Sequence, residues 1–326
     1  MDLVLLLFDS ICTQADEGID YGITQFAAWL DIREMEPILY MYNLLNQYGI
    51  DTVSFAANVA WAMDCYERGI ITKETTGGLP LNWGDYETAI ALVHLIAKRE
   101  GFGRIIGEGE KRAPELVDRE SEKYMYHVKG MTPVVEDPRV MKGFGLGYCT
   151  STRGGDHLRA LYMRAFGKSF VKNVFPKIPS VADDHVPKGK GVCVKWLEDY
   201  CAALDSCNVC KRPWLNVLPD PLERMLDMLT RFVSAVTGFE MNGTEILRVG
   251  ERIYNVEKAF NSREGLTRKD DNFTNPEKFT KEPVKDGPGR GLGFERDEML
   301  NEYYRARGWD HNGVPTQDKI KDLEVI

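Results

Sequence analysis

The stretch Ala202-Ala203-Leu204-Asp205-Ser206-Cys207-Asn208-Val209-Cys210-Lys211 ends an apolar helical run that begins at Val194. The run stops at an acid, which is followed by two cysteines three residues apart and then by a lysine. A thiolate beside a lysine at a helix end is suited to metal ligation or redox chemistry. A pair of structural thiols that cap a core helix would explain an isolated CxxC equally well. The stretch therefore marks the end of a core helix and leaves both interpretations of its cysteines open.

Composition excludes several classes of protein. With 326 residues, 43% of them hydrophobic and 28% charged, the chain is long enough for two globular domains with a sizeable core. Its formal charge of −9 argues against nonspecific binding to nucleic acid or to an anionic membrane, and solubility alone explains that charge. Seven cysteines without framework spacing indicate a reducing, cytoplasmic compartment. The apolar opening over residues 3–8 is too short for a signal peptide or a membrane span.

Helical periodicity organises most of the remaining chain. Apolar residues recur at i, i+3, i+4 and i+7 in several segments, many of which stop at a glycine. Asp51 and Asp85 fall at N-caps, where a carboxylate accepts hydrogen bonds from backbone N–H groups, and the cap alone explains Asp51 on local grounds. No segment alternates between apolar and polar residues as a strand would. We therefore predict a mainly helical protein, with helices over residues 26–30, 37–48, 52–68, 86–100, 194–204, 222–237, 244–261 and 297–307.

Residues 129–160 are rich in Gly and Pro and predict an irregular segment. Gly143, Gly145 and Gly147 lie close together there, and Arg153-Gly154-Gly155-Asp156-His157 follows them. Such dense glycine permits close backbone approach to something bulky, and a plain inter-domain loop is the alternative. We place a domain boundary at this point, which gives one helical domain over residues 1–128 and a second over residues 129–326.

One pattern occurs at two helix ends. Asn46-Gln47-Tyr48-Gly49-Ile50-Asp51 ends one helix, as Asp205-Ser206-Cys207-Asn208-Val209-Cys210 ends another. Each copy has a polar residue, three variable positions, an aliphatic residue and then Asp or Cys. Two loops of one pattern on two helical domains could hold two halves of one ligand.

These motifs together resemble the aldehyde ferredoxin oxidoreductase family of tungsten or molybdenum pterin enzymes. The family's repeated signature is Asp-x-x-Gly-Leu-Asp/Cys, and both helix-end loops are similar to it. Further similar stretches run in family order from about residue 17 to residue 320. They are Gly49-Ile50-Asp51-Thr52, Trp83-Gly84-Asp85, Gly107-Glu108-Gly109, Lys129-Gly130, Asp137-Pro138-Arg139, Arg153 to Arg159, Arg252 to Asn255, Phe260 to Gly265, Tyr303-Tyr304 and Arg307-Gly308-Trp309-Asp310.

The resemblance implies a fold and a set of partners. The family has an N-terminal β-rich domain and two mainly helical domains, with a tungsten- or molybdenum-bis-pterin centre between them. This chain resembles the two helical domains only, the first of them incomplete at its N-terminus. Cys210 stands where the family's final Cys ligates a [4Fe–4S] cluster, and the CxxCxxxC motif for the remaining ligands is absent. The implied partners are ferredoxin or an Fe–S electron-transfer subunit and a polypeptide with the β-rich domain and CxxCxxxC motif; a homo-oligomer is also possible.

The resemblance also assigns site residues. His157 matches a proton donor or acceptor near the metal, and Tyr21 matches a substrate-pocket tyrosine. Asn46 replaces an Asp of the signature, Asn208 replaces its Gly, and Gly22 stands where many members have a catalytic Glu. The candidate cofactor-binding residues are Asn46, Asp51, Thr52, Arg159, Asp205, Val209 and Lys211.

Three hypotheses of function follow. In the first, the chain is the carboxy-terminal part or subunit of an oxidoreductase that converts an aldehyde and water to a carboxylic acid. Its electrons pass to an Fe–S cluster and ferredoxin, and the chain is expected to be inactive without the missing N-terminal portion. The second keeps the cofactor but changes the reaction to a low-potential reduction of the benzoyl-CoA reductase active-site-subunit type, which Gly22 favours. The third is a helical binding module that has lost its cofactor, with a zinc site at Cys207 and Cys210 as a variant.

Overall fold

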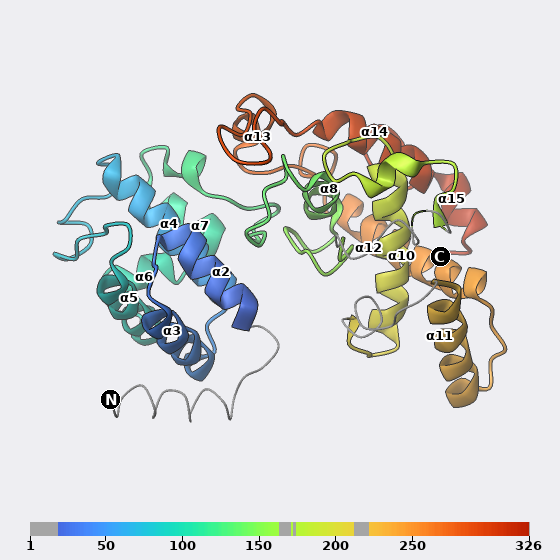
Figure 1. Cartoon of the computed structure of the whole chain (residues 1–326), viewed down its shortest axis with the longest axis horizontal. Helices are drawn as coiled ribbons and strands as arrows, with labels where there is room; N and C mark the ends of the chain where they lie inside the picture. The colour runs from blue at the N-terminus through green and yellow to red at the C-terminus, as the bar shows by residue number, and fades with distance from the viewer. Residues whose placement is uncertain (1–18, 163–170, 172–173, 212–221, 326) are drawn as a thin grey trace. The chain divides into compact units, whose positions relative to one another are not determined.

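The computed structural model describes residues 19–162, 171, 174–211 and 222–325, without the side chains of residues 19–22, 222–225 and 276 (Figure 1). The chain divides into two compact units. Unit 1 is Met1–Val135 with Phe273–Asn275, and unit 2 is Glu136–Asn272 with Pro276–Ile326. The correspondence of these units to the predicted domains stays a prediction. The regular structure throughout the described residues is helical apart from two isolated β-bridges, so the predicted mainly-α fold class is confirmed.

Unit 1 consists of helices that pack around one apolar core. Helix α2 packs against α3 and α4, and the rings of Phe26 and Phe55 meet edge-on with centroids 6.1 Å apart. A Cβ added at Gly103 would lie 2.2 Å from the Leu95 carbonyl carbon, so glycine is what allows α6 to approach α5. The helices of unit 1 are α2 (Ile19–Leu30), α3 (Met35–Tyr48), α4 (Thr52–Glu67), α5 (Tyr86–Lys98), α6 (Gly103–Ile106), α7 (Gly109–Val117) and the 3₁₀ helix η1 (Ser121–Tyr124).

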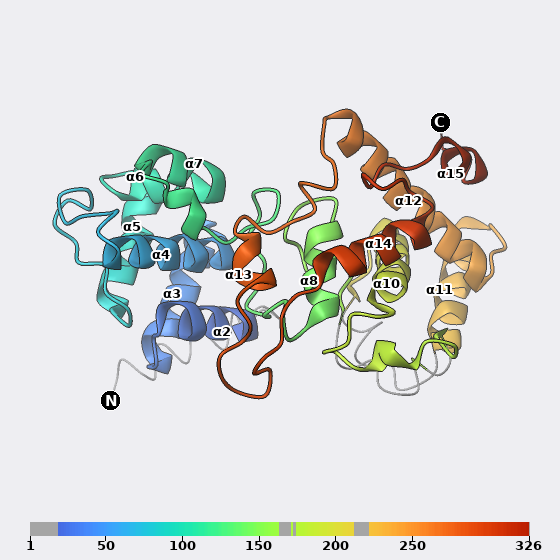
Figure 2. The same ribbon diagram turned by 90° about the horizontal axis from the view of Figure 1, so that it is seen from above.

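Unit 2 is built around one helix, α10 (Lys190–Ser206), which contains the predicted apolar run and packs against α8, α12 and α14 (Figure 2). Glycines allow the closest approaches: an added Cβ at Gly250 of α12 would lie 1.8 Å from the Asp199 carbonyl oxygen. At Gly191 it would lie 2.4 Å from the Tyr303 amide nitrogen of α14. The other helices are α8 (Lys142–Thr150), η3 (Pro179–Ala182), α11 (Leu222–Thr237), α12 (Gly243–Arg263), α13 (Pro276–Thr280), α14 (Arg296–Arg307) and α15 (Gln317–Asp322).

The prediction that residues 129–160 are irregular is wrong over α8, which is helical and buried along its whole length. Its glycines serve packing inside the protein. An added Cβ at Gly143 would lie 2.3 Å from the Tyr162 ring, and one at Gly145 would lie 2.6 Å from the Phe294 ring. Tertiary contacts have therefore overridden the low helix propensity of glycine.

The interior of unit 2 also contains charged groups. Arg307 and Glu198 are fully buried, with Nη2 and Oε2 2.7 Å apart, and Arg307 also pairs with Asp199. The hydroxyls of Tyr303 and Tyr254 donate to Glu198 at 2.5 and 2.8 Å. Because a buried charge is tolerated only when it is paired and hydrogen-bonded, these contacts fix α10, α12 and α14 against one another.

None of the helices in the described ranges is both long and apolar enough to cross a membrane.

Candidate functional site

The first helix-end loop, residues 46–51, is called loop A. Helix α3 ends there at Gly49, whose φ is +68°. The Gly49 N–H donates to the Asn46 carbonyl at 3.1 Å, and the Ile50 N–H donates to the Leu45 carbonyl at 2.9 Å. This pair of bonds is a Schellman motif, in which a residue in the left-handed conformation closes the helix.

The second loop, residues 205–210, is called loop B and follows α10 with the same backbone. Asn208 takes the left-handed position with a φ of +55°. Its N–H donates to the Asp205 carbonyl at 3.0 Å, and the Val209 N–H donates to the Leu204 carbonyl at 3.4 Å. Asn is one of the few residues besides Gly that visit this conformation routinely. The replacement of the signature's Gly by Asn208 therefore preserves the turn, and the two loops match bond for bond.

The side chains of loop A present acceptor atoms at the surface. Asn46 donates through Nδ2 to the Tyr42 carbonyl at 2.9 Å, so its Oδ1 is left as an acceptor and can replace the oxygen of an Asp. Asp51 accepts from the Ser54 N–H at 2.7 Å through Oδ1, which confirms its prediction as the N-cap of α4. Thr52 is the first residue of that helix.

In loop B the corresponding acid is held by cations. Asp205 lies 2.8 Å from Lys211 Nζ through Oδ1 and 3.3 Å from Arg159 Nη1 through Oδ2. Lys211 also donates to the Leu158 carbonyl at 2.8 Å, and its side chain is nearly buried. Val209 packs on the apolar cluster that includes Leu204 and anchors the loop. Loop B thus combines a partly exposed carboxylate with two inward-facing cations.

Arg159 is the centre of this arrangement. It is buried, pairs with both Asp205 and Glu257, and lies over the Tyr254 ring at 5.4 Å. Burial lowers the pKa of Arg159, but Tyr254, Glu257 and Asp205 together raise it above its ordinary value, so the guanidinium stays charged. Its Nε is buried and makes no hydrogen bond. A buried donor without an acceptor costs about 1–3 kcal/mol, which marks this atom for a ligand acceptor.

The two cysteines of the CxxC differ in their surroundings. Cys207 is the C-cap residue of α10 and is half-buried, and burial raises its thiol pKa. Cys210 is exposed. The described residues contain no group of three or more His, Cys, Asp or Glu side chains that could hold a metal ion. Cys210 is therefore the accessible thiol of the pair, and any cluster bound to it needs further ligands.

His157 and Tyr21 are placed to different degrees. His157 is half-buried, and its carbonyl accepts from the Leu161 N–H at 2.8 Å. The neighbouring Asp156 accepts from the Leu158 N–H at 2.8 Å, so this turn connects His157 to the segment that binds Lys211. Tyr21 belongs to α2, but its side chain lies outside the described part of the structure.

Glu257 and Thr152 were not predicted as site residues from the sequence. Glu257 pairs with Arg159 and accepts from the Thr152 hydroxyl at 2.6 Å. The sequence carries one weak signal, since Tyr254 and Glu257 are three residues apart and share a face of α12. Their contact with Arg159 joins segments almost one hundred residues apart, which spacing cannot reveal.

Each loop, taken by itself, presents groups that a pterin can bind. Loop A supplies the acceptor oxygens of Asn46 and Asp51, which suit the N–H donors of a pterin ring. Loop B supplies the acceptor oxygens of Asp205, and Arg159 and Lys211 beside it supply cations and an unpaired N–H, which suit ring N–H donors and a phosphate.

Comparison with known proteins gives a consistent result. A family profile described as "Aldehyde ferredoxin oxidoreductase, domains 2 & 3" matches residues 9–325. The tungsten-containing aldehyde ferredoxin oxidoreductase of Pyrococcus horikoshii is 34% identical over 94% of this chain and 48% of its own length. The "Aliphatic sulfonate oxidoreductase, WOR-like subunit" of Pyrococcus furiosus is 27% identical over 91% of this chain and 44% of its own. This chain therefore spans about half the length of these curated relatives.

Among solved structures, the active-site complex BamBC of benzoyl coenzyme A reductase with 1,5-dienoyl-CoA has a similar fold. The TM-score is 0.70 at 20% identity, over 94% of this chain and 48% of that chain. At this identity the likeness concerns the fold alone.

Proposed function

This chain belongs to the aldehyde ferredoxin oxidoreductase family, and we propose that it supplies the two helical domains of a tungsten or molybdenum bis-pterin oxidoreductase. The reaction takes an aldehyde and water to a carboxylic acid, two protons and two electrons. Because the chain spans about half the length of its relatives, the β-rich domain and the CxxCxxxC motif come from a further polypeptide or segment. The complex acts in the cytoplasm, in keeping with cysteines that form no disulfide within the described residues.

The observation that carries the proposal is the match between loops A and B. Two helices in separate units end in the same Schellman motif, with a hydrogen-bond acceptor at the first position, Asn46 or Asp205. A repeated turn that presents equivalent acceptors suits a cofactor made of two like halves. We assign one pterin to each loop.

Each site residue then has a defined task. Asn46 and Asp51 accept from ring N–H groups of one pterin, and Thr52 contributes the N-terminus of α4, which favours anions. Asp205 accepts from the other pterin, whose phosphate is bound by Arg159 and Lys211. Val209 holds loop B against the core. The cofactor, when bound, supplies the oxidation of the substrate and the transfer of its electrons.

Cys210 ligates one iron of a [4Fe–4S] cluster. Its exposed thiol can reach a ligand outside the chain, unlike the half-buried Cys207. The remaining three ligands come from the partner's CxxCxxxC motif, and ferredoxin or an Fe–S subunit receives the electrons. His157 moves a proton at the substrate, and Tyr21 lines the substrate pocket.

The test uses the tagged chain isolated from its own organism with its bound partners. We expect tungsten or molybdenum, iron and the visible absorbance of a cluster in the purified complex. Cys210→Ser should remove the cluster absorbance and much of the iron, whereas the matched variant Cys207→Ser should keep both. Colourless, metal-free complexes of the wild-type chain would contradict the proposal.

A low-potential reductase of the benzoyl-CoA reductase type is the second candidate. The feature that favours it is Gly22, which occupies the position after Tyr21 where many family members have Glu. Assays of the complex with an aldehyde and with an aryl-CoA thioester separate the two reactions. Activity on the thioester alone would exclude aldehyde oxidation.

A further inference from the structure

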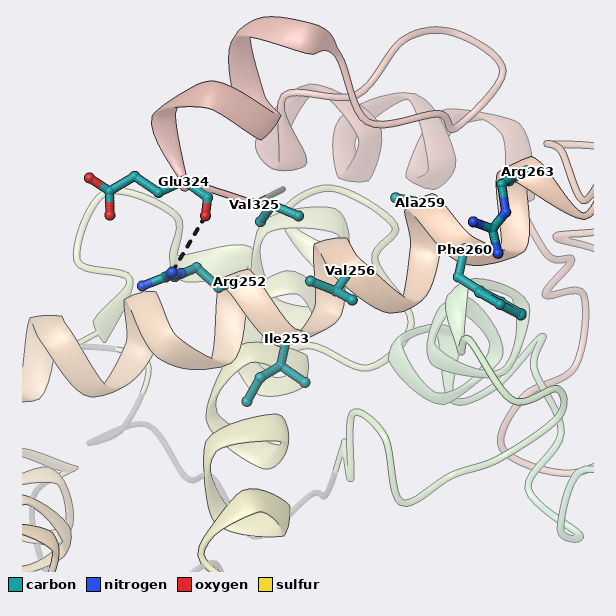
Figure 3. Close-up of a pocket in the computed structure, with 8 residues that line it drawn as sticks. All are labelled: Arg252, Ile253, Val256, Ala259, Phe260, Arg263, Glu324 and Val325. Atoms are coloured by element: carbon teal, nitrogen blue, oxygen red, sulfur yellow. Dashed lines mark hydrogen bonds between the residues drawn. The ribbon is translucent and has the colours of Figure 1, made fainter. Parts of the chain in front are cut away.

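Helix α12 has an apolar stripe on the side that faces away from α10. Val256 and Phe260 lie on this stripe, and their side chains are 51% and 56% exposed. Arg252 and Arg263 stand at its two ends, and this spacing places all four residues on one face of the helix (Figure 3). The opposite face of α12, with Gly250, is buried in unit 2. Large apolar side chains exposed in a row are characteristic of an interaction site.

The stripe forms one wall of a groove, and residues 324–325 form the other. The α12 groove, as we call it, lies between residues 252–263 and residues 324–325 and has a volume of about 610 Å³. Arg252 Nη2 donates to the Glu324 carbonyl at 3.5 Å. Figure 3 shows the Glu324 carboxylate pointing away from that contact, while Val325 turns toward the groove. Residues 324–325 therefore shape the groove, and the contact between Arg252 and Glu324 is made through a backbone carbonyl and not through the carboxylate.

Charge defines what can fill the groove. The two guanidinium groups are eleven residues apart, or about 16 Å along the helix axis, with Ile253, Val256 and Phe260 between them. Arg263 Nε lies 3.5 Å from the neighbouring Glu264, but both side chains are exposed, so this pair neutralises little of the charge. The groove thus matches an apolar segment with acidic residues at its ends.

A second copy of the chain is a poor occupant. A two-fold contact between α12 helices places the same patch on both partners. Since the stripe carries Arg at both ends, antiparallel helices would bring Arg252 of one copy against Arg263 of the other. Like charges at an interface disfavour the complex.

We propose that the α12 groove binds an apolar segment flanked by acidic residues, in the polypeptide that supplies the rest of the enzyme. This inference rests on the proposed function, in which a partner provides the part that this chain lacks. In the Pyrococcus horikoshii relative, of which this chain covers 48% of the length, a comparable length of chain lies outside the matched region. An extended segment of about five residues would span the distance between the two arginines.

The first experiment compares two matched variants of the tagged chain, expressed in its own organism. Val256→Glu introduces an acid into the groove, whereas Val236→Glu introduces one on α11, where Val236 is 84% exposed. We expect Val256→Glu to reduce the co-purified partner, identified by its CxxCxxxC motif, at least tenfold. Val236→Glu should leave the yield of that partner unchanged. Phe260→Ala, a truncation at an exposed site, provides a second groove variant that keeps the fold.

A second measurement identifies the occupant. A photo-crosslinking amino acid at position 260 of the same complex should attach to a segment of the partner that contains apolar residues beside Asp or Glu. The complex should also weaken as salt rises, and Arg252→Glu with Arg263→Glu should weaken it at least tenfold.

The outcomes separate this inference from the proposed function. The proposed groove interaction is wrong if Val256→Glu and Phe260→Ala leave the yield of co-purified partner unchanged, or if the crosslink attaches to a second copy of this chain. The proposed function still holds in that case, provided that the complex contains the metal. A wild-type chain that isolates without metal and without the CxxCxxxC polypeptide overturns both.

Discussion

In loop A, Asn46 and Asp51 bond to backbone groups within about a turn of themselves, and the helix before the loop is exposed on one side. In loop B, Asp205 is bound by Arg159 and Lys211, and the helix before it is buried on nearly every side. The backbone hydrogen bonds of the two loops are nevertheless the same. A shared turn therefore does not imply a shared environment, and the chemistry of each loop depends on the helices behind it.

The largest expected effect concerns the support of loop B. Gly250→Ala puts a methyl group 1.8 Å from the Asp199 carbonyl oxygen, so α12 and α10 must separate. We expect a loss of about 3 kcal/mol in the free energy of unfolding. Gly49→Ala in loop A meets no atom within 4 Å and carries only the strain of its positive φ, about 1 kcal/mol. Urea unfolding of both variants measures the difference, and equal losses would contradict the contrast between the two supports.

The next effect concerns the cation behind loop B. Arg159→Met removes the positive charge between Asp205 and Glu257. The side chains of these two acids are 38% and 34% exposed. Solvent screening reduces the loss, which we expect to be about 2 kcal/mol. In loop A, Asn46→Ala removes one exposed hydrogen bond and should cost about 0.5 kcal/mol or less.

Hydrogen exchange provides the local measurement for Arg159→Met. The amides of loop B should exchange faster in this variant, and those of loop A should not change. Arg159→Lys, which keeps the charge but not the two-armed contact, should fall between the wild type and Arg159→Met. Equal exchange in both loops would mean that Arg159 does not support loop B specifically.

Acid should weaken the packing of α12 through Glu251. This carboxylate lies 2.7 Å from Lys319 and 3.2 Å from Lys195 of α10. Burial raises the pKa of Glu251, but the two lysines outweigh it and hold the pKa below the ordinary 4.5. A lowered folded-state pKa means that the stabilisation is complete above pH 4.5 and is lost as the pH falls through the folded value.

Glu251→Gln measures this contribution. At neutral pH the variant should be less stable than the wild type by about 1 kcal/mol, and the difference should disappear in acid as the wild-type carboxyl is protonated. Unfolding curves at several pH values provide the measurement. A difference that persists at low pH would show that the amide disturbs packing and not charge.

The sequence predicted those features that local rules control. The helices around loops A and B, the Asp51 cap and the repeated pattern all follow from spacing within a few residues, and the structure confirms them. Helix α8 escaped prediction because its glycines are poor helix formers in isolation. Only their contacts with Tyr162 and Phe294, which are distant in sequence, make that helix favourable.

The candidate site divides in the same way. The residues within each loop could be predicted from the sequence, because the same spacing occurs in both loops. Glu257 and the unpaired Nε of Arg159 were not, because both depend on contacts between α12 and the segment after α8. Ion pairs between residues that are distant in the sequence leave no periodic pattern in it. Loop B has such ion pairs, whereas the hydrogen bonds described for loop A are local.

A further small effect, that of Asn208→Gly, tests the shared backbone itself. If Asn208 occupies the left-handed position for the same reason as Gly49, then Asn208→Gly should change the free energy of unfolding by only about 0.5 kcal/mol. Asn208→Val, with a β-branched side chain that avoids this conformation, should cost about 1–2 kcal/mol, and Gly49→Val should cost a similar amount. Urea unfolding compares the three variants. If Asn208→Val were as stable as the wild type, the left-handed conformation of residue 208 would not be what ends α10. Loops A and B would then not share the turn that ends their helices.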